Sequence, residues 1–146
     1  MKVHYDSRAA CWFQTDNNNL TFGGEKKQLI QKMDNRISTF SLDLNLINNH
    51  AGPLIGILAG RKLDSSLTGN GDLFIKLQEV LVNLGGVSFV FTPEDARKED
   101  IDGYLYHPEE KKWLKIKAPY PDVVYNRTPF RKLEEANAFK ASFKAW

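Results

Sequence analysis

Short apolar runs separated by polar, turn-forming stretches characterise the first 50 residues. The apolar runs are 11–13, 20–22, 29–30 and 37–42, and the stretches 16–19, 23–24 and 34–35 lie between them. Apolar and polar positions alternate loosely with period two within the runs, which is typical of strands, and no helical periodicity competes. We therefore predict three or four short antiparallel strands in this segment.

The pattern changes at Pro53. Residues 54–58 form a continuous apolar run, Leu-Ile-Gly-Ile-Leu, which suits a strand buried on both faces. Residues 74–84 carry leucines and a phenylalanine at helical spacing, and the following Gly-Gly pair predicts the end of that helix. Residues 87–91 are a second apolar run. Strand, helix and strand in this order predict a βαβ unit with a right-handed crossover.

The remaining pattern predicts four further elements. Residues 92–95 indicate a cap followed by a short helical turn. Residues 101–106 and 113–116 indicate a hairpin, and 122–125 a third core strand. Residues 133–146 have an amphipathic helical pattern whose apolar face continues to Trp146 without a capping signal, so we expect a larger protein to continue past it.

Composition indicates one compact globular domain. The chain has 146 residues, of which 42% are hydrophobic and 26% charged, with a net charge of +2. Its strongest basic cluster, Lys111, Lys112, Lys115 and Lys117, follows two glutamates, and this mixture favours a solvated strand face over a nucleic-acid surface. We therefore expect no nucleic-acid partner.

The cysteine content and the N-terminal segment indicate a cytoplasmic protein. Cys11 is the only cysteine, so no intrachain disulfide can form, and its apolar surroundings favour a small buried thiol. The charged segment 1–8 lacks the apolar region of a signal peptide, and no apolar run approaches the roughly 18 residues of a membrane span. We expect no membrane association.

The common catalytic and metal-binding motifs are missing. The three histidines, His4, His50 and His107, are far apart and have no ligand-like spacing, so no metal site is expected. His107 precedes a proline at the predicted hairpin tip and is expected to be exposed. No nucleophile-elbow, dinucleotide or phosphate-loop signature is present, and Gly56 is interpreted as a packing glycine.

The loop at 61–71 follows the carboxyl end of a predicted central strand, where open α/β sheets bind ligands. Its small and hydroxylated residues could contact a polar or anionic group. The candidate loop contacts are Gly60, Ser65, Ser66 and Thr68.

The run 121–127, Pro-Asp-Val-Val-Tyr-Asn-Arg, is the most informative site signal. A strand there would deliver Asn126 and Arg127 at its carboxyl end, with Arg131 shortly after. An arginine fork binds carboxylate or phosphate through two hydrogen bonds, and an adjacent asparagine can recognise an amide or a hydroxyl. The alternative is an arginine that pins the following helix by pairing with Glu134, and the local sequence leaves the two open.

These segments resemble the YheC/YheD family of endospore coat-associated proteins, which have the ATP-grasp fold. The resemblance covers roughly residues 53–135 and rests on Ile55–Leu58, Phe89–Asp95, Ile101–Tyr104, Trp113, Pro121–Arg127, Arg131 and Glu134. It implies an α/β fold class: a Rossmann-like pre-ATP-grasp domain with a short parallel sheet at 53–128. A small β-rich extension at 1–52 would precede it, and a helix at 129–146 would lead towards an absent ATP-grasp domain.

The resemblance also implies a function. Complete members would use Mg-ATP to activate a carboxylate for attack by an amine, and this chain would be the truncated, substrate-side part, inactive alone. It would bind substrate through Asn126, Arg127 and Arg131 and hold no cofactor itself. Its expected partners are a missing or separately encoded ATP-grasp domain and spore coat proteins, which would make it spore-associated.

The alternative function is a freestanding, non-catalytic protein- or ligand-binding module. The resemblance implies an ATP-dependent ligase, but this chain lacks residues that would grip ATP or magnesium. Whether it acts as an enzyme is therefore left open.

Overall fold

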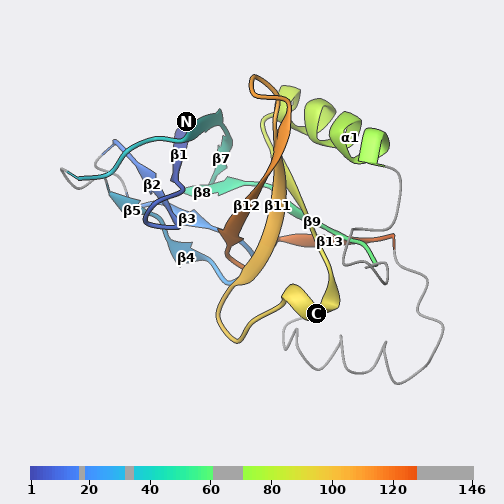
Figure 1. Ribbon diagram of the computed structural model, residues 1–146. Helices are drawn as coiled ribbons and strands as arrows, with labels where there is room; N and C mark the ends of the chain where they lie inside the picture. The colour runs from blue at the N-terminus through green and yellow to red at the C-terminus, as the bar shows by residue number, and fades with distance from the viewer. Residues whose placement is uncertain (17–18, 32–34, 61–70, 128–146) are drawn as a thin grey trace.

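The computed structural model describes residues 1–16, 19–31, 35–60 and 71–127 (Figure 1). The N-terminal strands are β1 (Lys2–Asp6), β2 (Cys11–Gln14), β3 (Thr21–Phe22), β4 (Lys27–Gln28), β5 (Ile30–Gln31), β6 (Phe40–Asp43), β7 (Asn45–Ile47) and β8 (His50–Gly52). The later elements are β9 (Leu54–Leu58), α1 (Gly71–Asn83), β10 (Val87–Phe91), the 3-10 helix η1 (Pro93–Asp95), β11 (Ile101–His107), β12 (Lys112–Ala118) and β13 (Val123–Asn126). The predicted helix at 133–146 lies outside the described residues.

The N-terminal strands form two small mixed sheets, with strand orders β5-β2-β1-β6 and β4-β3-β8-β7. Four of them were predicted, but the expectation of purely antiparallel pairing is wrong, because β2 pairs parallel with β5 and β3 pairs parallel with β8. The sequence reading also missed β1. No strand was predicted in the charged segment 1–8, whereas Val3 and Tyr5 alternate with polar residues and are buried.

The predicted βαβ unit is confirmed by the five-stranded sheet, whose order is β12-β11-β10-β9-β13. β9 pairs parallel with both β10 and β13. Gly56 lies at the middle of β9, where an added Cβ would lie 2.8 Å from the Phe91 ring and 2.9 Å from Pro121 Cγ. Close packing therefore explains this glycine, as the sequence suggested.

Helix α1 covers one face of this sheet. Phe74 is buried against Ile57 and Val90, and Leu77 packs against the same cluster. The helix ends where the Gly-Gly pair predicted: Gly85 has φ +90°, its N–H donates to Val82 O, and Gly86 N–H donates to Leu81 O. These two bonds are a Schellman motif, which satisfies the last carbonyls of the helix.

The hairpin and the turn before it are also confirmed. β11 and β12 pair antiparallel along their whole length, and Thr92 caps η1. The expectation that His107 is exposed is wrong. It is buried, its ring meets that of Phe40 edge to face, and its Nδ1 accepts a hydrogen bond from Glu110 N–H. The contact with β6 is long-range, so the local sequence gave no sign of it.

The expected α/β Rossmann-like fold class is wrong: the described chain is mostly β, with three mixed sheets. A Rossmann-like sheet needs helices on both faces, and α1 is the only α-helix among the described residues. Figure 1 shows the N-terminal strands on the side of the large sheet away from α1. Aromatic side chains from these strands, including Tyr5, Trp12 and Phe22, fill the face that a second layer of helices would cover.

One hydrophobic core joins the two halves of the sequence. The buried cluster contains Val3 and Leu20 from the N-terminal half together with Leu58, Phe89 and Ile116 from the large sheet. Polar contacts accompany it: Trp12 Nε1–H donates to Lys117 O at 2.8 Å, and Lys117 N–H donates to the Tyr5 hydroxyl at 3.0 Å. The division into two domains near residue 52 therefore stays a prediction, and the hydrophobic core is continuous across that position.

Candidate functional site: the carboxyl edge of the parallel strands

The three parallel strands end at one edge of the large sheet. Leu58 is opposite Phe91 on one side and Asn126 on the other. Two backbone bonds extend this pairing past the strands, since Ala59 N–H donates to Phe91 O at 2.8 Å and Arg127 N–H donates to Leu58 O at 2.9 Å. The topology therefore brings Gly60 and Arg127 to the same edge, although they are far apart in sequence.

Asn126 and Arg127 lie exposed at this edge. The Arg127 guanidinium carbon is 5.8 Å from the Tyr125 ring centroid, and Arg127 Nη1–H donates to the Tyr125 hydroxyl at 3.4 Å. This stacking restricts the side chain while leaving other N–H groups of the fork to bind an anion. Of the remaining predicted contacts, Gly60 is half-buried. Ser65, Ser66, Thr68 and Arg131 lie outside the described residues.

The prediction that β13 is a core strand is wrong. It is the terminal strand of its sheet, and Val123 and Tyr125 are 51% and 43% exposed. Its apolar sequence suggested burial on both faces, but only one neighbouring strand, β9, pairs with it in the described part of the chain. Arg127 thus follows an exposed strand rather than a buried one.

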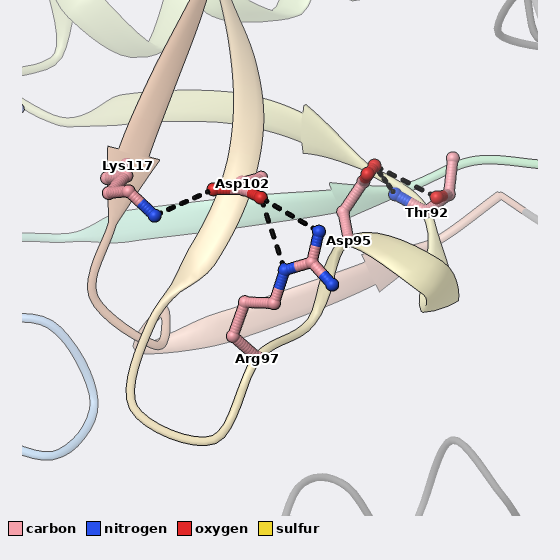
Figure 2. A network of polar contacts seen from close by, with 5 residues as sticks. All are labelled: Thr92, Asp95, Arg97, Asp102 and Lys117. Carbon is pink, nitrogen blue, oxygen red and sulfur yellow. Dashed lines mark hydrogen bonds and ion pairs between the residues drawn. The ribbon is translucent and has the colours of Figure 1, made fainter.

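After β10 the chain turns into η1, and Thr92 and Asp95 form the N-terminal cap of that helix. The Asp95 carboxylate accepts hydrogen bonds from Thr92 N–H at 3.0 Å and from the Thr92 hydroxyl at 2.9 Å (Figure 2). Both residues are buried. The carboxylate is therefore committed to holding the turn and is a poor candidate for ligand chemistry.

Asp102 is the centre of a neighbouring ion cluster (Figure 2). Its Oδ2 accepts a hydrogen bond from Arg97 Nη2–H at 3.1 Å, and its Oδ1 accepts one from Lys117 Nζ–H at 3.3 Å. Burial raises the pKa of the Asp102 carboxyl, but the hydrogen bonds and charges of Lys117 and Arg97 together outweigh burial and lower it below its ordinary value. Both cations therefore pair with this one carboxylate, which indicates a stabilising role.

A hydrogen-bonded chain of three side chains joins the β3/β8 sheet to the segment before β13. The Thr21 hydroxyl lies 2.7 Å from His50 Nδ1, and His50 Nε2 lies 2.7 Å from Asp122 Oδ1. Leu54 N–H donates to the other oxygen, Oδ2, at 2.8 Å. An ionised Asp122 only accepts, so His50 Nε2 carries a proton, and in the neutral ring Nδ1 accepts from Thr21.

This order of hydroxyl, imidazole and carboxylate is also that of nucleophilic triads. Here, however, the backbone N–H of Thr21 donates to Asn49 O and cannot stabilise an oxyanion. The hydrogen-bonded side chains of Thr21, His50 and Asp122 therefore link β3, β8 and the segment before β13. Sequence reasoning missed it because His50 is 29 residues from Thr21 and 72 from Asp122, and no local pattern marks such a pairing.

Other classes of site find no support in the residues that the structure describes. These residues contain no cluster of three or more His, Cys, Asp or Glu side chains that could hold a metal ion. None of the helices within the described ranges is long and apolar enough to cross a membrane. Burial raises the pKa of the Cys11 thiol, which disfavours a reactive thiolate.

Comparison with known proteins gives one informative similarity. Over 92 residues, 60% of this chain, the sequence is 36% identical to the endospore coat-associated protein YheD of Bacillus subtilis (strain 168). The matched part spans only 20% of that relative. No family model matches the chain, and no solved structure matches it. The resemblance to the YheC/YheD family is thus confirmed for about three fifths of the chain, as a partial match to YheD.

Proposed function

We propose that this chain is the substrate-side part of a YheC/YheD-like, spore-coat-associated protein. The 36% identity to an endospore coat-associated protein carries the proposal. The chain matches a fifth of that relative's length, so an ATP-grasp reaction, with Mg-ATP bound by a separate region, is part of what is proposed.

The carboxyl edge supports the substrate-binding role. Asn126 ends β13, Arg127 follows it, and the half-buried Gly60 follows the neighbouring β9, so a guanidinium, an amide and a glycine lie at one edge. This combination suits a carboxylate or phosphate group. The edge would position such a group, while activation by ATP would occur on residues elsewhere, so we expect the chain alone to be inactive.

A titration followed by NMR tests the binding role. The ¹⁵N-labelled chain is titrated separately with sodium glutamate, inorganic phosphate and Mg-ATP. Glutamate or phosphate should shift the amide signals of Gly60, Asn126 and Arg127, and Arg127→Ala should abolish these shifts. Lys115→Ala, which removes an exposed cation from β12 of the same sheet, is the control and should retain them.

Two results would overturn the binding role. One is the absence of shifts at this edge with both anions, and the other is their persistence in Arg127→Ala. Binding of Mg-ATP more tightly than inorganic phosphate would contradict the placement of nucleotide binding elsewhere.

Spore association needs its own experiment. A fluorescent fusion of the chain, produced in sporulating Bacillus subtilis, should concentrate at the spore periphery. A uniform signal throughout the mother cell would contradict the association, whatever the outcome of the titrations.

A further inference from the structure

A groove of about 550 Å³ lies between the N-terminal half and helix α1, separate from the carboxyl edge. We call it the β6 groove. Residues 38–42 form one wall, α1 forms the opposite wall, and residues 105–109 at the end of β11 complete it.

The interior of the β6 groove is largely apolar. Phe40 and Leu42 of β6 are half-buried and pack against the main core. Ile75 and Val82, two turns apart on α1, face them across the groove and are also half-buried. Side chains entering the groove would therefore bury apolar surface on both walls.

Within the described ranges, β6 also forms an unpaired sheet edge along its wall of the groove. β6 is the terminal strand of its sheet and pairs with β1. Leu44 N–H donates to Met1 O at 2.7 Å. Such bonds recur at alternate residues of an antiparallel ladder, so the N–H and C=O of Ser41 face away from β1. Ser41 is exposed and lines the groove, so these groups can pair with an added strand.

The opposite wall is held rigidly. Gln78 of α1 is buried, and its side-chain amide bonds the Tyr106 backbone twice, since Nε2–H donates to Tyr106 O at 2.7 Å and Oε1 accepts from Tyr106 N–H at 3.0 Å. Past β6, Asn45 bonds the end of α1 through its N–H to Gly85 O and through Nδ2 to Leu84 O. The two walls are therefore preorganised for an occupant.

The rim of the groove is acidic. Glu79 of α1 and Glu109 of the hairpin tip are exposed, and the described residues that line the groove include no lysine or arginine. This contrasts with the net charge of +2 on the whole chain. The local charge favours a cationic occupant.

We propose that the β6 groove binds an extended, basic peptide segment of a protein partner by strand addition to β6. The segment pairs with Ser41, buries alternate apolar side chains against Phe40, Leu42, Ile75 and Val82, and directs lysine or arginine side chains towards the two glutamates. β6 has four residues, so the paired part is about 13 Å long. This inference is independent of the substrate-binding role proposed for the carboxyl edge.

The probe is the capped peptide Ac-Val-Lys-Val-Lys-Val-amide, added to the ¹⁵N-labelled full chain. It should shift the amide signals of residues 39–43 and of α1 residues 75–83, with little change at Asn126 and Arg127. Two control peptides separate the contributions: replacing both lysines by glutamates removes the charge match, and N-methylating the backbone removes the ladder donors. Each should bind at least about tenfold more weakly.

Matched variants test the groove itself. Ser41→Pro removes the outward N–H and should weaken binding about tenfold, whereas Ser41→Ala keeps that N–H and should bind as the parent does. Glu79→Gln combined with Glu109→Gln should weaken binding of the basic peptide. Glu94→Gln, which changes an exposed glutamate of η1 outside the groove, should not. Because these glutamates are exposed, the double variant also gives an answer if Ser41→Pro fails to fold.

Three outcomes would overturn the proposal. They are shifts confined to other surfaces, equal binding of the basic and acidic peptides, and a concentration-dependent dimer in sedimentation that Ser41→Pro abolishes. The last would assign the β6 edge to a second copy of this chain.

Discussion

At the scale of single residues, long-range polar contacts hold the fold together more than the sequence suggested. Asp122 illustrates this, because one oxygen accepts from His50 and the other from Leu54 N–H. From the sequence alone, Asp122 is notable only as part of the run 121–127, which resembles the YheC/YheD family. Its role depends on a histidine 72 residues away, a distance at which local patterns carry no information.

Replacing Asp122 with alanine should lower the free energy of unfolding by about 2 kcal/mol, because two donors lose their acceptor in a partly buried site. Urea denaturation measures the difference. Asp16→Ala, which removes an exposed carboxylate, is the control and should change stability little. An Asp122→Ala variant as stable as the parent would show that the Thr21–His50–Asp122 chain contributes nothing to the fold.

Asp102 predicts a dependence of stability on pH. Its pKa is lower in the folded chain than the ordinary value of 3.8, which is expected when unfolded. The stabilisation is therefore fully present above about pH 4 and is lost as the pH falls through the folded pKa. Lowering the pH from 6 to 2.5 should therefore reduce the stability of Asp102→Asn less than that of the parent. Urea midpoints at the two pH values measure this difference, and an equal drop in the two proteins would contradict the prediction.

At the scale of elements, the sequence predicted those whose signals are local. The apolar runs of β9 and β10, the spacing of α1 and the glycine stop after it all lie within a few residues of what they specify. Elements of the N-terminal half were harder to predict. Several of its strands have two or three residues, too few for any periodicity, and their pairing is settled by distant partners.

Gly85 at the end of α1 gives an element-scale prediction. Gly85→Ala should destabilise the chain by about 1–2 kcal/mol, because an L-residue is disfavoured at φ +90°. The new Cβ would also lie 2.4–2.5 Å from the Asn45 side chain. Thermal unfolding by circular dichroism is the measurement.

Gly71→Ala is the matched control for this substitution. A Cβ there meets nothing within 4 Å, and Gly71 starts the same helix, so stability should stay equal or rise. Equal loss of stability in the two variants would contradict the role assigned to the Schellman turn.

At the scale of the whole molecule, the core joins what the sequence divided at residue 52. Because side chains of the N-terminal strands complete one face of the large sheet, neither half should be stable without the other. We expect a single cooperative unfolding transition, with coincident curves from tryptophan fluorescence and far-ultraviolet circular dichroism. Two separate transitions would instead support residues 1–52 as an independent unit.

Part of the candidate site could be predicted from the sequence, and part is visible only in the structure. The sequence identified Asn126 and Arg127 because they end a family-like run, and the structure brings them to the edge shared with Gly60. The β6 groove could not be predicted, because its walls come from residues 38–42, α1 and the end of β11. No motif encodes a surface assembled from three distant segments.

By itself, the sequence determined the local elements between residues 54 and 126 and the family resemblance, because helical spacing, apolar runs and turn chemistry act over a few residues. Only the tertiary structure decided which layer covers the second face of the large sheet. Aromatic side chains from four short N-terminal strands, β1, β2, β3 and β6, supply that layer in place of helices. This layer depends on packing between segments far apart in the sequence, which local patterns do not reveal. The described fold is therefore mostly β, whereas the sequence predicted α/β.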